Sequence, residues 1–306
     1  MYRYRAYGFT IDADMPLPEL QPATDGPADV TIRFAAVGRP EAPPDPQTSA
    51  YAVSPDDVRF FWELVGSFRV HAGREILVDP IPNVEQDLLR IPLLGSVLGV
   101  LLHQRGRFVL HASAIDIHGQ AAIFLGPKGQ GKSTTAALLV GRGHPLIADD
   151  IVALSLDGSS PIQIVPGFPQ MKLFDDAAAS ALGDDPEQLP LLASLIPKRA
   201  RRTPGQFSAR PLPPGAIYVL ADGPELFVTR ITGQEAVCEV IGSSIPARFG
   251  SDLLDGPASL THFQRVMTLV RQVPVYLLQR PRDLAGLSLL GAAIEETLRQ
   301  PVGASA

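Results

Sequence analysis

A nine-residue stretch, residues 126–134, constrains the fold of this chain more than any other feature. It reads Gly-Pro-Lys-Gly-Gln-Gly-Lys-Ser-Thr and fits the phosphate-loop pattern G-x-x-x-x-G-K-[ST]. The apolar run Ala121–Leu125 before it predicts a strand, and Ser133–Arg142 after it predicts a helix. Glycine permits the turns that aim backbone N–H groups at an anion in front of a helix N-terminus. The stretch therefore predicts a nucleoside triphosphate site; the alternative is an ordinary glycine turn before a helix.

The side chains of this phosphate loop have distinct expected roles. Lys132 supplies a mobile positive charge for the β- and γ-phosphates, and the hydroxyl of Ser133 is placed to ligate Mg²⁺. The predicted nucleotide-binding residues are Gly126, Lys128, Gly129, Gln130, Gly131, Lys132, Ser133 and Thr134.

The composition limits the partners and the compartment of the protein. At 306 residues the chain suits one large or two modest domains, and its net charge of −6 gives no basic field that would favour nucleic acid. The single cysteine, Cys238, excludes a disulfide framework and is compatible with a reducing compartment. Cys238 lies in the alternating run Ala236–Ile241, which predicts a strand with the thiol buried.

No segment of the sequence is expected to enter a membrane. The first residues, Met1–Arg5, contain no apolar core like that of a signal peptide. The longest apolar stretch, Ile91–Leu102, is interrupted by Pro92, Gly95 and Gly99 and is too short to span a bilayer. We therefore expect a soluble, cytoplasmic protein that binds neither membrane nor nucleic acid.

Residues 1–82 predict a small β-rich domain. Several short segments alternate between apolar and polar residues or are rich in aromatic residues, which is typical of half-buried strands. The proline-fixed segment Met15–Leu20 predicts an extended turn. The expected strands are residues 2–11, 29–35, 58–62, 66–72 and 74–78.

Residues 83–300 predict a second, α/β domain, followed by a disordered tail at residues 301–306. Its first helix, residues 83–104, would be capped by Asn83 and buried along its apolar centre. The other expected helices are residues 175–182, 186–195, 260–272 and 284–299. The expected strands are residues 108–117, 120–125, 145–150, 151–154, 162–165, 216–220, 226–231, 236–241 and 275–278.

Two kinds of charged residue outside the loop are candidates for the site. A buried strand that ends in Asp149 and Asp150 follows the loop, where a second Mg²⁺ contact or a catalytic carboxylate is expected. The alternative is a strand-end turn in which one acid caps backbone amides. Residues 196–205 are basic and lack a set of apolar residues to bury. They predict a mobile loop that clamps a nucleotide or an acidic peptide; the alternative is a solvated charge run. The candidate phosphate or substrate contacts are Lys172, Lys198, Arg199, Arg201 and Arg202.

Residues 109–152 resemble the kinase domain of HPr kinase/phosphorylase. The likeness rests on the histidine segment Leu110–Ala114, the phosphate loop, and Arg142–Asp150, which ends in a hydrophobic–Ala–Asp–Asp sequence. The turn Leu17–Leu20 and the segment Pro166–Leu173 are similar to HPr-kinase-related proteins encoded beside peptide-modification genes. Among these are kinases that phosphorylate lasso-peptide precursors on a C-terminal serine.

The resemblance implies a fold, a cofactor and roles for three residues. The implied fold is an HPr-kinase-like phosphate-loop core with a mixed β-sheet and flanking helices, preceded here by the small β-rich domain. Asp149 matches the carboxylate that takes the proton from the acceptor hydroxyl, Asp150 the acid near the metal, and His111 the histidine beside the phosphate site. The resemblance also implies ATP as the phosphate donor and Mg²⁺ as the cofactor.

Two departures from the family narrow this expectation. The chain has Pro127-Lys128 where the family's loop usually carries a serine. The glycine-rich signature that follows the kinase core of the bifunctional enzymes is not recognisable in this sequence. We therefore expect neither the phosphorylase reaction nor HPr as the substrate.

Three functions remain open from the sequence. The leading one is an ATP-dependent serine kinase that acts on a peptide, in its sharpest form on the C-terminal serine of a lasso-peptide precursor. The others are a kinase for a small hydroxylated metabolite and a nucleotide-sensing binding protein with little turnover. The paired acids argue against a sensor, because a sensor needs no base. The sequence leaves the oligomeric state open, and a homo-oligomer is compatible with it.

Overall fold

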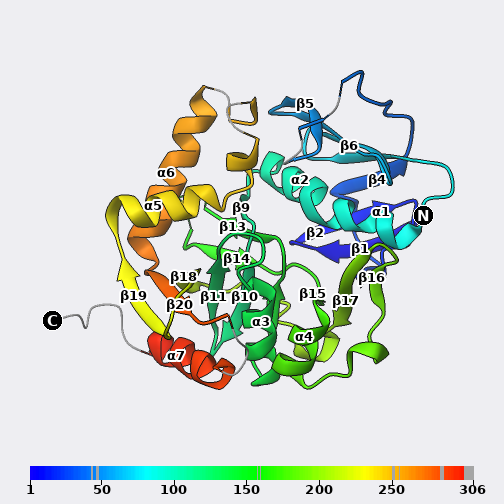
Figure 1. Ribbon diagram of the computed structural model, residues 1–306. Coiled ribbons are helices and arrows are strands. Elements are labelled where there is room, and N and C mark those ends of the chain that lie inside the picture. Colours follow the sequence, from blue (N-terminus) through cyan, green and yellow to red (C-terminus); the bar gives the residue numbers. More distant parts are fainter. Residues whose placement is uncertain are drawn as a thin grey trace.

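The computed structural model of the protein is a mixed α/β fold with several sheets and flanking helices (Figure 1). It describes residues 1–42, 44–45, 48–156, 158, 160–249, 252–254, 256–282 and 286–299. The predicted tail at residues 301–306 lies outside the described residues. The β-rich N-terminal part and the part that carries the phosphate loop lie side by side (Figure 1).

The N-terminal part forms an eight-stranded sheet with the order β3-β1-β2-β4-β8-β7-β6-β5. The strands predicted at residues 29–35, 58–62, 66–72 and 74–78 are confirmed. The single strand predicted at residues 2–11 is wrong, because the chain turns back at Tyr7 and Gly8, where φ is 51° and 75°. The strands are β1 (Tyr2–Ala6), β2 (Phe9–Ala13), β3 (Gln21–Pro22), β4 (Val30–Phe34), β5 (Ala50–Ser54), β6 (Asp57–Trp62), β7 (Gly66–His71) and β8 (Glu75–Pro80).

The helical segment after this sheet is bent. It consists of α1 (Gln86–Pro92), the π-helical turn η1 (Leu93–Val97) and α2 (Leu98–Gln104). The bend lies at Gly95, where φ and ψ are −107° and −112°. The helix begins after Glu85, so the predicted cap at residue 83 is wrong.

The same helical segment is the one among the described residues that is long and apolar enough to cross a membrane. Of its most apolar window, 56% is buried inside the protein. Leu93, Val97 and Leu101 belong to a core shared with the N-terminal sheet, so the predicted burial of the apolar centre is confirmed. A mostly buried core helix can have the same length and composition as a helix that crosses a membrane.

A six-stranded mixed sheet carries the phosphate loop, and its order is β12-β10-β11-β18-β20-β19. The pairs β11–β18 and β18–β20 are parallel, and the remaining pairs are antiparallel. Residues 121–125 of the central strand β11 are fully buried, because helices cover both faces of a sheet of this kind. The strands are β10 (Ser113–Ile117), β11 (Gln120–Leu125), β12 (Leu146–Ala148), β18 (Pro214–Asp222), β19 (Phe227–Ile231) and β20 (Val275–Arg280).

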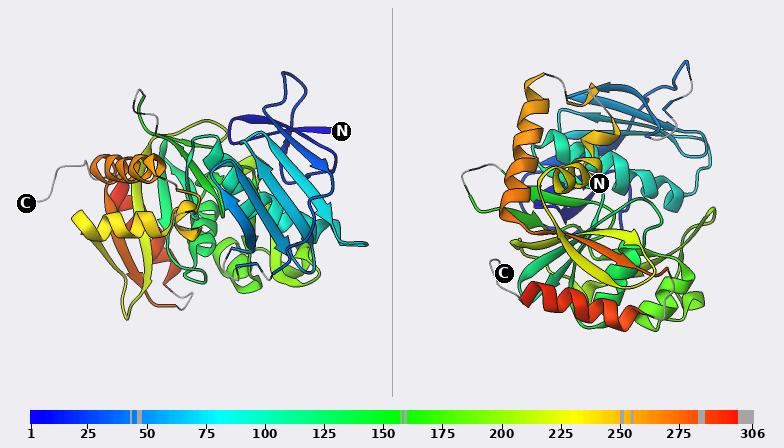
Figure 2. Two further views of the ribbon diagram at one scale, coloured as in Figure 1. Left: turned by 90° about the horizontal axis from the view of Figure 1, so that it is seen from above. Right: turned by 60° about the vertical axis from the view of Figure 1, so that its left-hand side comes forward.

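Helices pack on the two faces of this mixed sheet (Figure 2). The helices α3 (Lys132–Gly141) and α7 (Leu287–Arg299) share a core with one face, which includes Phe124. The helices α5 (Gly233–Gly242) and α6 (Pro257–Gln272) share a core with the other face, which includes Ile123. Neighbouring residues of β11 thus point into different layers, as strand geometry requires.

Two three-stranded sheets complete the part around the site. One has the order β14-β13-β9 and the other β15-β17-β16. Short helical turns lie between β15 and β16, namely α4 (Asp175–Ala177), η2 (Ala178–Leu182) and η3 (Pro186–Gln188), after β17, namely η4 (Pro204–Gln206), and between α5 and α6, namely η5 (Pro246–Arg248). The strands are β9 (Phe108–Leu110), β13 (Val152–Ser155), β14 (Gln163–Val165), β15 (Gln170–Leu173), β16 (Leu191–Ala193) and β17 (Ile196–Arg202).

Four local predictions are wrong. The strand expected at residues 108–117 is two strands, β9 and β10, in different sheets. The helix expected at residues 186–195 is a short turn followed by β16, and the mobile basic loop expected at residues 196–205 is largely β17. Residues 236–241 lie in helix α5, and Cys238 is exposed on it rather than buried. The alternating pattern misled here because it also places Ala236 and Val240 four residues apart on one buried helix face.

Candidate active site

The phosphate loop connects the end of β11 to the start of α3. Gly126, Gly129 and Gly131 have φ values of 142°, 91° and 76°, which other residues rarely adopt. A Cβ atom at Gly126 would lie 3.1 Å from the carbonyl oxygen of Leu220, and one at Gly131 would collide with the guanidinium of Arg280. The loop therefore needs glycine both for its turns and for its close approach to neighbouring strands.

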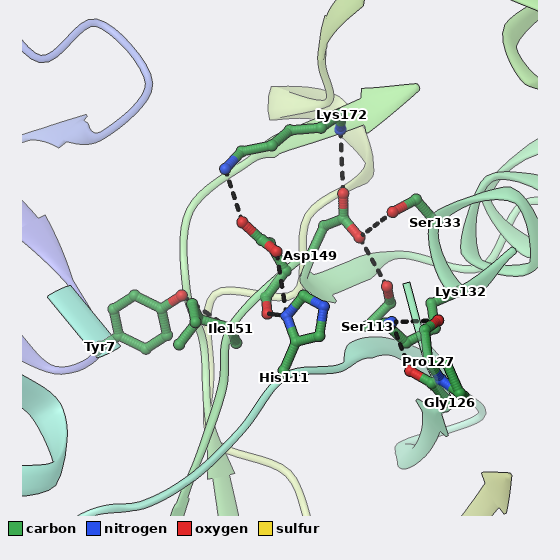
Figure 3. A network of polar contacts seen from close by, with 11 residues as sticks. Tyr7, His111, Ser113, Gly126, Pro127, Lys132, Ser133, Asp149, Ile151 and Lys172 are labelled. Atoms are coloured by element: carbon green, nitrogen blue, oxygen red, sulfur yellow. Dashed lines mark hydrogen bonds and ion pairs between the residues drawn. The ribbon is translucent and has the colours of Figure 1, made fainter. Parts of the chain in front are cut away.

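Lys132, at the first position of α3, is held by the loop itself. Its ammonium nitrogen donates to the carbonyl oxygens of Gly126 at 2.7 Å and of Pro127 at 3.2 Å (Figure 3). Burial lowers the pKa of the Lys132 ammonium, although Asp150 and Asp149 oppose this shift. The two carbonyls thus keep a buried cation at the place where a phosphate loop binds phosphate.

Asp149 directly follows β12 and is hydrogen-bonded to the phosphate loop. Its Oδ1 accepts hydrogen bonds from Ser113 Oγ at 2.7 Å and from Ser133 Oγ at 2.9 Å, and its Oδ2 accepts from the backbone N–H of Lys172 at 3.0 Å (Figure 3). The residue is 4% exposed. A buried carboxylate with three donors is held in one orientation.

Asp150 lies beside it in a separate set of contacts. Its Oδ2 is 2.8 Å from the ammonium of Lys172, its Oδ1 is 3.3 Å from Nδ1 of His111, and its backbone carbonyl oxygen is 3.0 Å from the same Nδ1. Burial favours the neutral acid, but Lys172 and His111 outweigh it and hold the pKa of Asp150 well below its usual range. Burial favours the neutral amine of Lys172, and Asp150 outweighs it and raises the Lys172 pKa. The pair is therefore ionised at neutral pH.

The break between β9 and β10 places His111. The strand β9 pairs with β13, whereas β10 pairs with β11 and β12, so the chain must leave one sheet and enter another at residues 111–112. The backbone N–H of His111 donates to the carbonyl of Ser243 at 2.8 Å, which fixes the connection against the end of α5. The histidine therefore reaches the acidic pair from a sheet junction.

A cavity of about 820 Å³ lies in front of these groups. Its wall contains the whole phosphate loop, His111, Ser113, Asp150, Lys172 and Lys198. Three arginines that the sequence did not single out also line it, namely Arg248, Arg280 and Arg282. Arg280 lies against the loop, with Nη2 3.3 Å from the carbonyl oxygen of Gln130. No sequence signal identified these arginines, because they come from turns and strand ends far along the chain.

The predicted basic clamp is only partly at this cavity. Lys198 lines it and lies over the ring of Phe174, 4.8 Å from the ring centroid. The guanidinium groups of Arg199 and Arg201 instead lie 2.8 Å from the carboxylates of Asp175 and Asp184. Arg199, Arg201 and Arg202 are absent from the described cavity wall. The structure therefore brings Lys172 and Lys198 to the site but not the three arginines of β17.

The side-chain oxygen atoms near the loop are suitable ligands for a magnesium ion. The Ser133 hydroxyl and the Asp149 carboxylate are in contact, and hydroxyl and carboxylate oxygens are the ligands that Mg²⁺ prefers. Within the described part of the chain no group of three or more His, Cys, Asp or Glu side chains could hold a metal by itself. This arrangement suits Mg²⁺ bound jointly by a few protein oxygens and nucleotide phosphates.

Comparison with known proteins gives a partial match around these residues. Residues 105–164 match the family described as HPr Serine kinase C-terminal domain. The HPr kinase/phosphorylase of Thermoanaerobacter sp. (strain X514) is 39% identical over 72 residues, which are 22% of this chain and 23% of that protein. That of Brevibacillus brevis is 34% identical over 88 residues, or 26% and 28% of the two chains. The chain thus spans about a quarter of the length of the curated relatives it matches.

A solved structure, the HPr(Ser) kinase/phosphatase from Coxiella burnetii, matches 62% of this chain and 93% of that chain, with 15% identity and a TM-score of 0.30. The similarity that bears on the site is the family match at residues 105–164. This segment contains His111, Ser113, the phosphate loop and the Asp149-Asp150 pair, whereas Lys172 and the arginines of the cavity lie outside it. The core of the site is therefore similar to the C-terminal domain of HPr serine kinases.

Proposed function

We propose that the protein is an ATP-dependent kinase that transfers the γ-phosphoryl group of ATP to a serine hydroxyl of a peptide or small protein. The observation that carries this proposal is the 2.9 Å hydrogen bond from Ser133 Oγ in the phosphate loop to Asp149 Oδ1 at the end of β12. This hydrogen bond connects the phosphate loop, where ATP would bind, to the acidic pair Asp149-Asp150. The family match at residues 105–164 supports the same chemistry.

The phosphate loop binds the donor nucleotide in this proposal. Backbone N–H groups at the start of α3 attract the phosphates, and Lys132 exchanges its two carbonyl partners for phosphate oxygens. Ser133 and Asp149 would hold Mg²⁺, which neutralises charge on the β- and γ-phosphates when it is bound. Arg280, packed against the loop, adds positive charge beside the leaving ADP.

The acidic pair prepares the acceptor. The acceptor oxygen bonds to the γ-phosphorus, the bond from that phosphorus to the bridging β–γ oxygen breaks, and the hydroxyl proton passes to a carboxylate. The family resemblance implies that Asp149 accepts the hydroxyl proton and that Asp150 lies near the metal. The contacts favour the reverse assignment, in which Asp149 binds the metal and Asp150 accepts the proton. Asp149 accepts a hydrogen bond from Ser133, whereas Asp150 and His111 line the cavity. The low pKa of Asp150 keeps it ionised and able to orient a hydroxyl.

The sharpest form of the proposal is a lasso-peptide precursor phosphorylated on its C-terminal serine. The segments Leu17–Leu20 and Pro166–Leu173 resemble HPr-kinase-related proteins encoded beside peptide-modification genes, and this group includes kinases of that kind. The cationic side chains of the cavity wall, such as Arg248 and Lys198, would suit an acceptor whose carboxylate lies near the reacting hydroxyl. Use of ATP fits a cytoplasmic enzyme, and a homo-oligomer is compatible with the proposal.

Mass spectrometry of peptides incubated with the protein, ATP and Mg²⁺ tests this function. A lasso-precursor peptide that ends in serine should gain phosphate, and the same peptide ending in alanine should not. ADP formed only in the presence of a small hydroxylated metabolite would instead indicate a metabolite kinase. Nucleotide binding without ADP formation, with every acceptor tried, would indicate a sensor and contradict the proposal.

A further inference from the structure

We propose that Tyr7 is a positioning residue for the acidic pair, so that the N-terminal β1–β2 hairpin is part of the phosphotransfer site. This inference rests on the proposed function. It concerns a residue outside the segment similar to HPr serine kinases, which begins at residue 105. Tyr7 reaches the site from the turn of this hairpin, and the contacts of its side chain determine what it does.

The hydroxyl of Tyr7 binds the backbone directly after the acidic pair. It donates to the carbonyl oxygen of Ile151 at 3.0 Å, and the two residues are 144 positions apart in the chain (Figure 3). Tyr7 is 1% exposed, and its ring packs edge-on against Phe168 with 6.3 Å between ring centroids. A buried hydroxyl with one strong acceptor holds that acceptor in place, because breaking the bond would leave a buried carbonyl unpaired.

The backbone of Tyr7 is also held in a fixed conformation at this contact. Its φ of 51° lies in the left-handed region, which is uncommon for a bulky residue and is kept only where the surroundings enforce it. Its N–H donates to the carbonyl oxygen of Pro166 at 2.9 Å. The turn thus holds both ends of the residue, with the N–H on one loop and the hydroxyl on another.

The Pro166 loop forms a second connection to the acidic strand. The N–H of Gly167 donates to the carbonyl oxygen of Ile147 at 2.9 Å, and a Cβ at Gly167 would lie 3.0 Å from the Tyr7 hydroxyl oxygen. Tyr7 therefore contacts Ile151 directly and Ile147 through the Gly167 backbone. Asp149 and Asp150 lie between those two points.

The same loop leads into β15, which carries Lys172. The N–H of Lys172 binds Asp149 and its ammonium binds Asp150. Asp150 has a φ of 75°, so the chain turns sharply at the acid that lines the cavity. Loss of the Tyr7 hydroxyl would free the Ile151 carbonyl beside this turn and let the two carboxylates move, whereas the contacts of Lys132 within the phosphate loop would remain.

The variant Tyr7→Phe removes only the hydroxyl, and Tyr4→Phe is its matched control. The Tyr4 hydroxyl, in the same hairpin, accepts a hydrogen bond from the N–H of Leu17 at 2.9 Å, and Tyr4 is 8% exposed. We expect Tyr7→Phe to lower kcat for peptide phosphorylation roughly ten- to a hundredfold, because small misplacements of reacting groups are costly. The KM for ATP should stay within about twofold of the wild-type value, and Tyr4→Phe should change kcat less than about twofold.

Hydrogen exchange of residues 147–152 gives a second measurement that needs no activity. Exchange should be faster in Tyr7→Phe than in both wild type and Tyr4→Phe, because the restraint on Ile151 is lost. Equal exchange in the two variants, or an equal kcat, would overturn the inference. If the wild-type protein transfers no phosphate, the proposed function fails, and the exchange comparison alone decides whether Tyr7 positions the acidic segment.

Discussion

The two walls of the cavity are built in different ways. The phosphate loop is one continuous segment between β11 and α3, and glycines within nine residues give it its shape. The acidic wall is assembled from separate parts of the chain, which contribute His111, Asp150 and Lys172. Tyr7 joins it through its hydrogen bond to the carbonyl oxygen of Ile151 (Figure 3). A local wall is recognisable from its pattern, whereas an assembled wall exists only in the folded protein.

The two walls also differ in their electrostatics. Lys132 is held by backbone carbonyls of its own loop, so its charge is available to a ligand. Lys172 and Asp150 form a half-buried ion pair in which each stabilises the charge of the other. Changes in the loop should therefore remove function and leave the fold intact, whereas changes in the acidic wall should affect both.

The largest effect is expected from Lys132→Ala. Removing the buried cation of the loop should lower phosphate transfer by about 10³-fold or more and weaken ATP binding. The free energy of unfolding should change little, because only contacts to two loop carbonyls are lost. Steady-state kinetics and nucleotide titration measure both effects, with Arg142→Ala, an exposed cation after the end of α3 that lies outside the described cavity wall, as the control. A wild-type rate for Lys132→Ala would contradict the assignment of the loop.

The next largest effects are expected from Asp149→Asn and Asp150→Asn, which separate the roles of the two acids. Each should lower the rate of transfer by roughly 10²- to 10⁴-fold, since each removes a charge at the reacting groups. If Asp149 holds the metal with Ser133, only Asp149→Asn should raise the Mg²⁺ concentration needed for half-maximal rate.

A metal titration of both variants, beside the cavity-lining control Asp176→Asn, makes this comparison. A raised Mg²⁺ requirement in Asp150→Asn alone would support the roles expected from the sequence, with Asp150 at the metal and Asp149 as the proton acceptor. Unchanged rates in both variants would remove the acidic pair from the mechanism.

Lys172→Met should cost stability as well as activity. Removing Lys172 leaves Asp150 half-buried without its ammonium partner, although His111 remains beside it, and we expect a loss of roughly 1–3 kcal/mol in the free energy of unfolding near neutral pH. Chemical denaturation as a function of pH measures it, with Lys198→Met as the control on the same cavity. An equal loss in the two variants would mean that the pair contributes nothing specific.

The pH dependence of this loss has a defined sign. The pKa of Asp150 is depressed from its usual value of 3.8, so its contribution to stability is present above that pH and is lost as the pH falls further. The pKa of Lys172 is raised from its usual value of 10.5, so its contribution is present below that pH and is lost as the pH rises further. The difference between wild type and Lys172→Met should therefore be largest between these two values and shrink in acid.

The sequence predicted the elements that local patterns determine. The loop, its flanking strand and helix, and four of the eight strands of the N-terminal sheet follow from glycine spacing and short-range alternation. The break at residues 111–112 was missed, because no glycine or proline marks it in the sequence and it arises from a change of sheet. Tyr7 was missed for a similar reason, since its partner Ile151 lies far away in the chain. What local patterns cannot give is which distant segments meet.

The basic strand β17 shows the same limit and gives the smallest expected effect. Its basic composition predicted a loop, but it pairs with β15 and β16. Arg199 and Arg201 form ion pairs with acids outside the described cavity wall. Replacing Arg199, Arg201 and Arg202 together by Gln should therefore change the KM for ATP or peptide less than about twofold, since screened surface charges contribute little. Lys198→Met, at the cavity wall, should raise one of these KM values more. A larger rise of these KM values in the triple variant would show that the arginines predicted from the sequence bind the nucleotide or the peptide.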